Sequence, residues 1–503
     1  VMLVLMLLTA SCSGPLLRRG PCPDPMDRLR ERLEVLFDDP AFGNAFWGVL
    51  IVSAETGEVL FARDANKSFV PASNMKLFTT AAALCRLGPD FRFQTQLIGL
   101  GPVDEENVLQ GPLVVVGSGD PTISGRFNEG RVTGIFEAWA DSLTARGVQT
   151  IDGDLIGDDD IFDDRPLGIG WAHDYLTEWY AAQISGLSFN DNCVDISIRP
   201  GHRAGEPALV ELNPTTDYVK LNKRLTTSLN PEGEGWHIHR FPGTNLVDLT
   251  GQMAISDEGY DGWFTVHNPT LYAVTVLKEV FAAHGIDVRG EVMDIDDLDK
   301  LSLTGQRERG VPMASFTSPS LAEIIKVINK RSQNFYAEQM LKTLGARFRG
   351  KGSFSAGIEV TEEVLEGMGI EPDQFIMVDG SGLSRHNFLT PRQVVILLSH
   401  MAGHKYFQFF RDSLPIAGVD GTIGKRMRGT PAHGRVWAKT GFVDRVRALS
   451  GYAYSRDDEM FIFSMIANNY TVPTSMAEDV QDTACQLLAN FSRQGEAAGE
   501  REP

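Results

Sequence analysis

The chain has 503 residues, and 43% of them are hydrophobic, so it can bury the cores of about three domains of ~150 residues each. Its 66 acidic and 46 basic residues give a formal net charge of −20, which repels phosphate backbones and anionic membrane surfaces. This composition excludes a small or disordered module and disfavours nucleic-acid binding. The five scattered cysteines contain no C-x-x-C pair, which argues against a disulfide framework, a zinc site and redox chemistry.

The first ten residues, VMLVLMLLTA, form an apolar run that is long enough for a signal-peptide core and too short to span a bilayer. Small residues precede Cys12 in a pattern that resembles a bacterial lipoprotein cleavage box. Cys12 is therefore a candidate for lipidation, with ordinary cleavage nearby as the alternative. We expect residues 1–26 to be a signal segment with a linker, and the mature chain to be periplasmic or otherwise extracytoplasmic. Membrane contact is expected only through a lipid on Cys12.

A hairpin is predicted next. Phe46–Val52 is a nearly continuous apolar strand, and the turn signal Glu55–Gly57 leads into a second strand at Glu58–Ala62. After Pro71, which is typical of a helix start, Met75–Leu84 has the composition of a buried helix.

The middle of the chain has a different composition. Residues 93–301 are rich in Gly, Asp and Val, and their short strand and turn patterns indicate mixed α/β or β-rich accessory domains. One amphipathic helix is predicted there, at Thr270–His284. Residues 319–404 return to a helical pattern.

Three further strands and a final helix are predicted near the C-terminus: Arg435–Lys439, Ala448–Tyr454, Met460–Ile466 and Ser475–Leu488. If the early hairpin joins these strands, the two ends of the chain build one antiparallel sheet flanked by helices, and the middle is an insertion. The expected division is a discontinuous sheet domain, two inserted accessory domains and a frayed tail: residues 27–95 with 305–492, 96–186, 187–304, and 493–503.

An S-x-x-K motif, Ser73 to Lys76, lies at the start of the predicted buried helix. On a helix the i, i+3 spacing places the hydroxyl and the amine on one face. A serine hydroxyl needs a base at neutral pH, and a partly desolvated lysine can be that base. The alternative is an ordinary helix-start serine with an exposed lysine.

Two more short motifs follow in the chain. Ser332-Gln333-Asn334 lies between two predicted helices, where a helix cap is the ordinary interpretation. Lys439-Thr440-Gly441 lies at the end of a predicted strand, where an ammonium and a hydroxyl can bind a carboxylate and the glycine permits close approach. The alternative for this triplet is an edge strand guarded by a lysine.

The order S-x-x-K, S-x-N and K-T-G resembles the penicillin-binding proteins and serine β-lactamases. Within that superfamily the chain is most similar to the D-alanyl-D-alanine carboxypeptidase/endopeptidase family, the class C low-molecular-mass penicillin-binding proteins, which carry a large insertion between the first two motifs. The similarity extends from about residue 30 to about residue 490 and includes five further stretches: Gly117–Pro121, Gly153–Leu155, Phe162–Asp163, Leu187–Asn192 and Asp379–Arg385.

The resemblance implies an α/β (α+β) fold of the penicillin-binding-protein and β-lactamase type, with two inserted accessory domains. It implies a serine-type D-Ala-D-Ala carboxypeptidase, with endopeptidase action on cross-links as a further activity. Peptidoglycan stem peptides and β-lactam antibiotics are the expected partners, and neither a cofactor nor a metal is expected. The preference between the two activities, the third residue of the stem peptide and the oligomeric state are left open.

The catalytic roles that the resemblance implies belong to three residues. Ser73 attacks the carbonyl carbon of the penultimate D-Ala, Lys76 accepts the proton of Ser73, and Ser332 passes a proton to the leaving D-Ala. Water then hydrolyses the acyl-enzyme.

Substrate binding falls to the other motif residues. By resemblance, Asn334 holds the amide of the acyl chain, and Lys439 and Thr440 receive the terminal carboxylate beside Gly441. The backbone N–H groups of Ser73 and Phe442 form the oxyanion hole, which is usually the largest single contribution in acyl transfer.

Two positions depart from the family pattern. Gln333 stands in the middle of S-x-N, where Asp or Asn is frequent, and this position need not take part in the chemistry. Phe442 follows K-T-G, where a Thr or Ser hydroxyl commonly helps to hold the carboxylate. Carboxylate binding is then left mainly to Lys439 and Thr440.

Alternatives to this function were a β-lactamase and a non-catalytic wall-binding protein. No Asn in the chain has a Glu four residues earlier, which is the arrangement that class A β-lactamases use for deacylation. Ser381, between two glycines, is interpreted as part of a turn. The acidic stretches Asp158–Asp160 and Asp163–Asp164 are interpreted as a solvated loop, with calcium or a cationic group as the alternative ligand.

Overall fold

The computed structural model describes residues 24–231, 235–298, 310–371 and 374–494. The predicted signal segment up to residue 23, and Cys12 within it, lie outside the described residues. In the part of the chain that is described, no helix is both long and apolar enough to cross a membrane.

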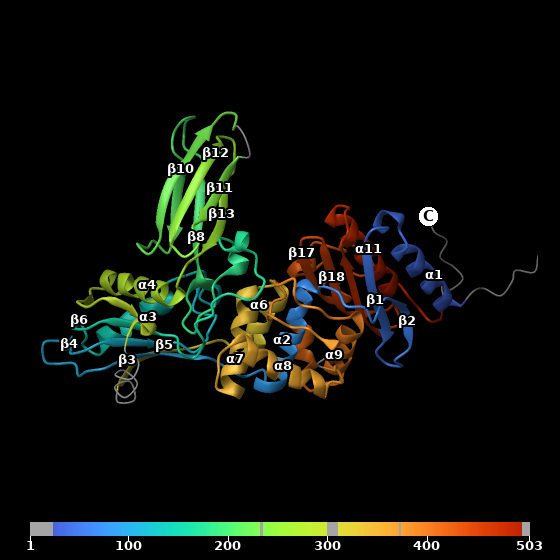
Figure 1. Cartoon of the computed structure of the whole chain (residues 1–503), viewed down its shortest axis with the longest axis horizontal. Coiled ribbons are helices and arrows are strands. Elements are labelled where there is room, and N and C mark those ends of the chain that lie inside the picture. The colour runs from blue at the N-terminus through green and yellow to red at the C-terminus, as the bar shows by residue number, and fades with distance from the viewer. Residues whose placement is uncertain (1–23, 232–234, 299–309, 372–373, 495–503) are drawn as a thin grey trace, which may run out of the picture.

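One five-stranded sheet joins the two ends of the chain. Its order is β17-β18-β19-β1-β2, and every neighbouring pair is antiparallel. In Figure 1 the blue strands β1 and β2 accordingly lie beside the red strands β17 and β18. The strands run over β1 (Phe46–Ser53), β2 (Val59–Arg63), β17 (Val436–Val443), β18 (Val446–Tyr454) and β19 (Met460–Asn468).

Both faces of this sheet are buried. Alternate residues of a strand point to opposite faces, so Val49 and Ile51 pack in one core and Leu50 packs in the other. The first core contains α1 (Pro25–Phe37) and α11 (Thr474–Ala489). This two-sided burial explains why β1 was recognisable as a continuous apolar run.

The second core is formed by a group of helices: α2 (Met75–Leu87), α6 (Leu321–Lys330), α7 (Asn334–Arg349), α8 (Phe354–Gly367), α9 (Pro391–Gly403) and α10 (Phe407–Ser413). Helix α2 lies at its centre, and every residue from Met75 to Leu84 is buried. A helix that is buried all round is stable only inside such a bundle. The expected antiparallel sheet flanked by helices is confirmed.

The insertion begins and ends on a pair of adjacent strands, β3 (Gln94–Gly99) and β16 (Val311–Thr317). They belong to a mixed sheet of order β15-β7-β5-β3-β16, and a smaller sheet has the order β14-β6-β4. The other members are β4 (Val108–Leu109), β5 (Leu113–Val116), β6 (Thr150–Ile151), β7 (Leu155–Asp158), β14 (Asp287–Val288) and β15 (Val292–Asp294).

Two further sheets protrude from the molecule as the green strands of Figure 1, with orders β13-β8-β9 and β10-β12-β11. Their strands are β8 (Cys193–Arg199), β9 (Leu209–Asn213), β10 (Lys220–Ser228), β11 (Trp236–Arg240), β12 (Leu246–Ala254) and β13 (Tyr260–Thr265).

The accessory part is nested. Strands β14 and β15 follow the protruding sheets in the chain but pair with β6 and β7, which precede them. Helices α3 (Gly134–Ala145) and α4 (Pro269–Ala283) share one hydrophobic core with all of these sheets. We therefore propose that the first accessory unit is itself discontinuous, and that the segment after about residue 268 returns to it.

Candidate active site

The side chains of Ser73 and Lys76 meet at the start of α2. Ser73 lies in the short 3-10 helix η2 (Ala72–Asn74), and Lys76 is fully buried one turn later. The Lys76 Nζ donates hydrogen bonds to Ser73 Oγ (2.9 Å), to Asn334 Oδ1 (2.6 Å) and to the backbone oxygen of Ser381 (2.7 Å). The alternative interpretation of Lys76 as an exposed lysine is wrong.

Burial lowers the pKa of Lys76 to about 7, although the nearby carboxylates of Glu338 and Asp379 act in the opposite direction. A neutral amine keeps two donors for Asn334 and the Ser381 carbonyl, and its lone pair is then available to Ser73 Oγ–H. The geometry and the titration together make Lys76 suitable as the general base for Ser73.

The S-x-N and K-T-G motifs lie opposite each other. Ser332 connects α6 to α7 with a left-handed φ of 58°, and its Oγ accepts a hydrogen bond from Lys439 Nζ at 2.9 Å. The same Nζ donates to the backbone oxygen of Thr440 at 2.8 Å. Burial lowers the pKa of Lys439 well below its usual value, and the positive charges of Lys76 and Arg447 add to this effect.

The alternatives for these two motifs do not describe the structure. Strand β17 is indeed at the edge of its sheet, but Lys439 is fully buried and so does not guard that edge. No side chain caps the start of α7, whose N-cap residue is Gln333.

Asn74 joins the first motif to the third. Its Nδ2 donates to the backbone oxygen of Lys439 (3.0 Å), and its Oδ1 accepts a hydrogen bond from Ser450 Oγ (2.6 Å). Gly441 permits this approach, because a Cβ there would lie 2.6 Å from the backbone oxygen of Pro71. Sequence reasoning missed Asn74 and Ser450, since both are unremarkable until α2 packs on the sheet.

A second threonine, from a separate segment, places a hydroxyl group beside Thr440. Thr422, in the 3-10 helix η9 (Gly421–Ile423), places its Oγ1 2.7 Å from Thr440 Oγ1. Phe442 itself is 53% exposed, and Arg447 lies over its ring. The pair Thr440 and Thr422 thus offers two adjacent hydroxyl groups beside Lys439.

Asn334 makes two hydrogen bonds within the protein that the sequence did not predict. Its Oδ1 accepts from Lys76, and its Nδ2 donates to the backbone oxygen of Tyr180 at 2.8 Å. An amide oxygen has two lone pairs and an amide nitrogen has two hydrogens, so one bond of each kind is left for a substrate amide. Tyr180 belongs to the inserted segment, which therefore contacts the second motif directly.

The segment around Ser381 is a turn, and its backbone positions the base. Ser381 is fully buried, and its Oγ accepts a hydrogen bond from Leu383 N. Glu338 accepts hydrogen bonds from the backbone N–H groups of Gly380 (2.7 Å) and Ser381 (2.8 Å), while Asp379 accepts from those of Gly382 and Ser384. Sequence reasoning missed Glu338, although it lies one helical turn after Asn334.

Gly382 is placed where no side chain fits. Its φ is +80°, and a Cβ would lie 1.9 Å from the backbone oxygen of Ala72, the residue before Ser73. Ala72 already has a left-handed φ of 47°, so the backbone beneath Ser73 cannot easily move away.

We expect Gly382→Ala to destabilise the fold more than Gly369→Ala does. Gly369 has a similar φ of +89° but open space around it. The left-handed conformation therefore costs both variants about 1–2 kcal/mol of stability, and only Gly382→Ala adds a steric clash. Thermal unfolding measures the difference, which we expect to be a melting temperature lower by roughly 4 °C or more. Equal melting temperatures would contradict the tight contact with Ala72.

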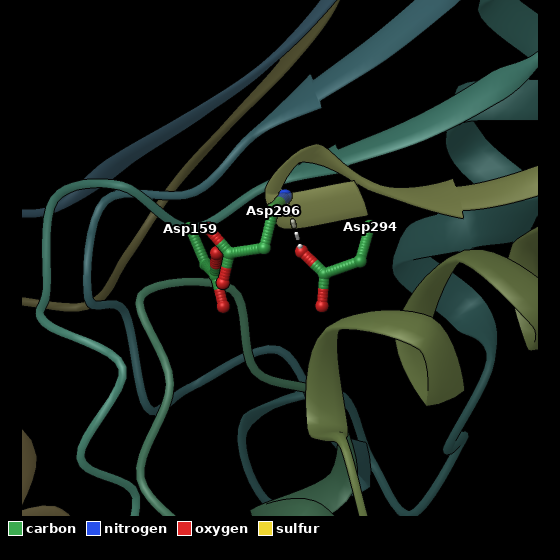
Figure 2. Close-up of side chains that lie close together, drawn as sticks. All are labelled: Asp159, Asp294 and Asp296. Atoms are coloured by element: carbon green, nitrogen blue, oxygen red, sulfur yellow. Dashed lines mark hydrogen bonds between the residues drawn. The ribbon is translucent and has the colours of Figure 1, made fainter. Parts of the chain in front are cut away.

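The acidic segment is solvated only in part, because Asp160 and Asp164 are exposed and the other three carboxylates are not. Asp158 is 2% exposed, and Asp163 pairs with the buried Lys342 at 2.6 Å. Figure 2 shows Asp159 beside Asp294 and Asp296, with one carboxylate oxygen of each within 4.8 Å of the others. Asp159 accepts hydrogen bonds from Ser185 and Thr270, and burial raises its pKa to about 6. An acidic cluster that is hydrogen-bonded in this way does not by itself indicate a metal site.

The chain is similar to several known proteins over most of its length. A family model described as D-Ala-D-Ala carboxypeptidase 3 (S13) matches residues 29–491. The D-alanyl-D-alanine carboxypeptidase of Actinomadura sp. (strain R39) is 35% identical over 478 residues, which cover 93% of this chain and 85% of the relative. The D-alanyl-D-alanine carboxypeptidase DacB of Haemophilus influenzae is 25% identical over 429 residues, which cover 84% and 85%. The crystal structure of penicillin binding protein 4 from Haemophilus influenzae superposes with a TM-score of 0.75 at 24% identity, covering 88% of this chain and 94% of that one.

Proposed function

Because the chain belongs to the D-Ala-D-Ala carboxypeptidase 3 (S13) family of serine hydrolases, we propose that it hydrolyses peptidoglycan stem peptides through an acyl-enzyme on Ser73. The observation that carries this proposal is the direct contact of Ser73 Oγ with the amine of Lys76, which is buried and titrates near neutral pH. A related crystal structure, that of penicillin binding protein 4 from Haemophilus influenzae, is described as complexed with a β-lactam.

In the acylation step, the neutral amine of Lys76 takes the proton of Ser73 as Oγ attacks the carbonyl carbon of the penultimate D-Ala. The negative charge that develops on the carbonyl oxygen is received by the backbone N–H groups of Ser73 and Phe442. Close packing of Gly441 against Pro71 brings β17 to the chain segment that carries Ser73, which supports this assignment.

The leaving D-Ala needs a proton on its nitrogen and a site for its carboxylate. The proton that Lys76 took from Ser73 must reach that nitrogen, and we assign its relay to the hydroxyl group of Ser332, whose Oγ accepts a hydrogen bond from Lys439 Nζ. The hydroxyl groups of Thr440 and Thr422 are suited to the carboxylate, because Lys439 is enclosed and its Nζ already binds Ser332 and the backbone oxygen of Thr440.

This mechanism makes acylation depend on pH. The neutral form of Lys76 is the active form, so we expect the acylation rate by benzylpenicillin to rise with pH through about 7 and to level off above it. Stopped-flow or mass-spectrometric acylation rates between pH 5 and pH 9 check this, with melting temperatures over the same range as the control for folding. A rate that falls through this range would contradict the role of Lys76.

Product analysis on purified muropeptides tests the function itself. We expect free D-Ala from monomeric pentapeptides, because the terminal carboxylate is the group that the hydroxyl groups of Thr440 and Thr422 can receive. Monomers released from cross-linked dimers would add endopeptidase action. The Ser73→Ala protein is the matched control, and a folded wild-type protein that releases neither product would contradict the proposal.

The same proposal includes the location. A wall substrate and the apolar start favour an extracytoplasmic mature chain, held at the membrane only if Cys12 is lipidated. One acyl chain binds a membrane marginally, so stable anchoring would need a second signal. The mass of the mature N-terminus distinguishes lipidation at Cys12 from ordinary cleavage.

A further inference from the structure

A cavity of about 430 Å³ lies beside the S-x-N motif, between the catalytic helices and the insertion. Its walls include Arg126, Trp179, Asp191, Trp263, Arg331 and Gln333, and we refer to it as the Trp263 pocket. Trp263 belongs to β13 of a protruding sheet and is 50% exposed, so its indole ring is accessible to a ligand.

The pocket is connected to the catalytic residues at two points. Arg331 and Gln333, which line it, are the two chain neighbours of Ser332. Trp179, which also lines it, precedes Tyr180, and the backbone oxygen of Tyr180 binds Asn334 Nδ2 at 2.8 Å. A ligand in the pocket therefore lies next to the groups that act on the substrate.

The wall around Asp191 is held rigidly. Asn190, Asp191 and Asn192 have left-handed φ values of 50°, 54° and 55°, which is costly for three consecutive non-glycine residues. Asp191 Oδ2 accepts hydrogen bonds from Arg126 (2.5 Å) and from Gln333 Nε2 (2.9 Å). The middle residue of S-x-N thus belongs to the wall of the pocket, and this explains why its identity need not affect the chemistry at Ser332.

The lining favours a neutral ligand with many hydroxyl groups. Two guanidinium groups, Arg126 and Arg331, balance two carboxylates, Asp191 and Asp195. The pocket thus has no net charge but offers both strong donors and strong acceptors. Trp179 and Trp263 lie 6.3 Å apart with their rings at 68°, and they offer apolar surface on which the flat side of a sugar ring can pack. The volume suits one or two such rings.

We propose that the Trp263 pocket binds a hexosamine unit of the glycan strand that carries the stem peptide. This inference rests on the proposed function, since it supposes a peptidoglycan substrate. It assigns to the insertion a part in substrate recognition: β13 and the segment containing Trp179 hold the sugar while Ser73 acts on the peptide.

The test compares two substrates that differ only in the sugars: a disaccharide-pentapeptide and the same pentapeptide after removal of the disaccharide. We expect the wild-type kcat/KM for D-Ala release to be about three- to tenfold higher for the sugar-bearing substrate. In Trp263→Ala that ratio falls to about one. Leu209→Ala is the matched control, because Leu209 lies in the same sheet, is also 50% exposed and does not line the pocket. It keeps the wild-type ratio.

Other outcomes overturn the inference. Equal kcat/KM values in the wild type, or an unchanged ratio in Trp263→Ala, would contradict sugar binding. Sugar binding would also be contradicted if Trp263→Ala lowered kcat/KM equally on cross-linked dimers with and without sugars. That result would assign the pocket to a second stem peptide. If benzylpenicillin acylation slows as much as hydrolysis does, the variant has disturbed the active site and the pocket has no role of its own.

A binding measurement separates this inference from the proposed function. If the wild type hydrolyses neither substrate, the proposed function fails. Tryptophan fluorescence titrated with the free disaccharide then decides about the pocket: saturable quenching in the wild type that is lost in Trp263→Ala supports it, and its absence in the wild type refutes it.

Discussion

Replacing Ser73 by alanine is expected to abolish acylation by benzylpenicillin and to reduce D-Ala release by at least about 10⁴-fold, because no covalent intermediate can form without the hydroxyl. The substitution removes one hydrogen bond of the Lys76 amine, which keeps its bonds to Asn334 and to the backbone oxygen of Ser381. We therefore expect a folded protein. Intact-protein mass spectrometry after incubation with benzylpenicillin reads the adduct, and a melting curve confirms folding.

Ser381→Ala is the control for this experiment, because Ser381 is the other serine at the Lys76 amine. Lys76 binds the backbone oxygen of Ser381 and not its hydroxyl, so the adduct should form in this variant. An adduct that persists in Ser73→Ala, or that maps to Ser381 or Ser332 in the wild type, would refute the assignment of the nucleophile. An adduct that is hydrolysed rapidly in the wild type would favour a β-lactamase.

Lys76→Ala is expected to slow acylation by roughly 10²–10⁴-fold, which is the usual contribution of general-base catalysis. The loss has two sources. Ser73 loses the base that touches its hydroxyl, and Asn334 loses the partner that holds its Oδ1. Single-turnover acylation by benzylpenicillin measures the rate without interference from deacylation.

Lys76→Arg distinguishes the base from a positive charge. A guanidinium stays protonated at every accessible pH, so it keeps the charge and cannot accept the proton of Ser73. We expect this variant to be as slow as Lys76→Ala and to lose the rise in rate near pH 7. Full activity in Lys76→Arg would show that the charge of Lys76 matters and that the proton goes elsewhere.

The sequence by itself determined the fold class and the candidate residues. Apolar strands at both ends of the chain predicted one antiparallel sheet, because a strand buried on both faces has a distinctive continuous pattern. The pair Ser73 and Lys76 was recognisable because an i, i+3 spacing is a local property of a helix. The order of the three motifs then indicated the family, which the comparisons confirm.

Contacts between segments that are distant in the chain could not be predicted from the sequence. The hydrogen bonds of Lys76 to Asn334 and Ser381, and of Thr440 to Thr422, join positions that no spacing rule relates. The same holds for β14 and β15, which pair with strands far earlier in the chain.

The chemistry of the site also needed the tertiary structure. Lysine is ordinarily protonated at neutral pH, and the pKa of Lys76 falls to about 7 only because the bundle around α2 removes water from its amine. Burial depends on every element packed around a residue, whereas a motif describes only its neighbours in the chain. The sequence therefore determined which groups are candidates for the active site, and the packing of α2 between the sheet, α7 and the Ser381 turn decided which of those groups meet and how far each is buried.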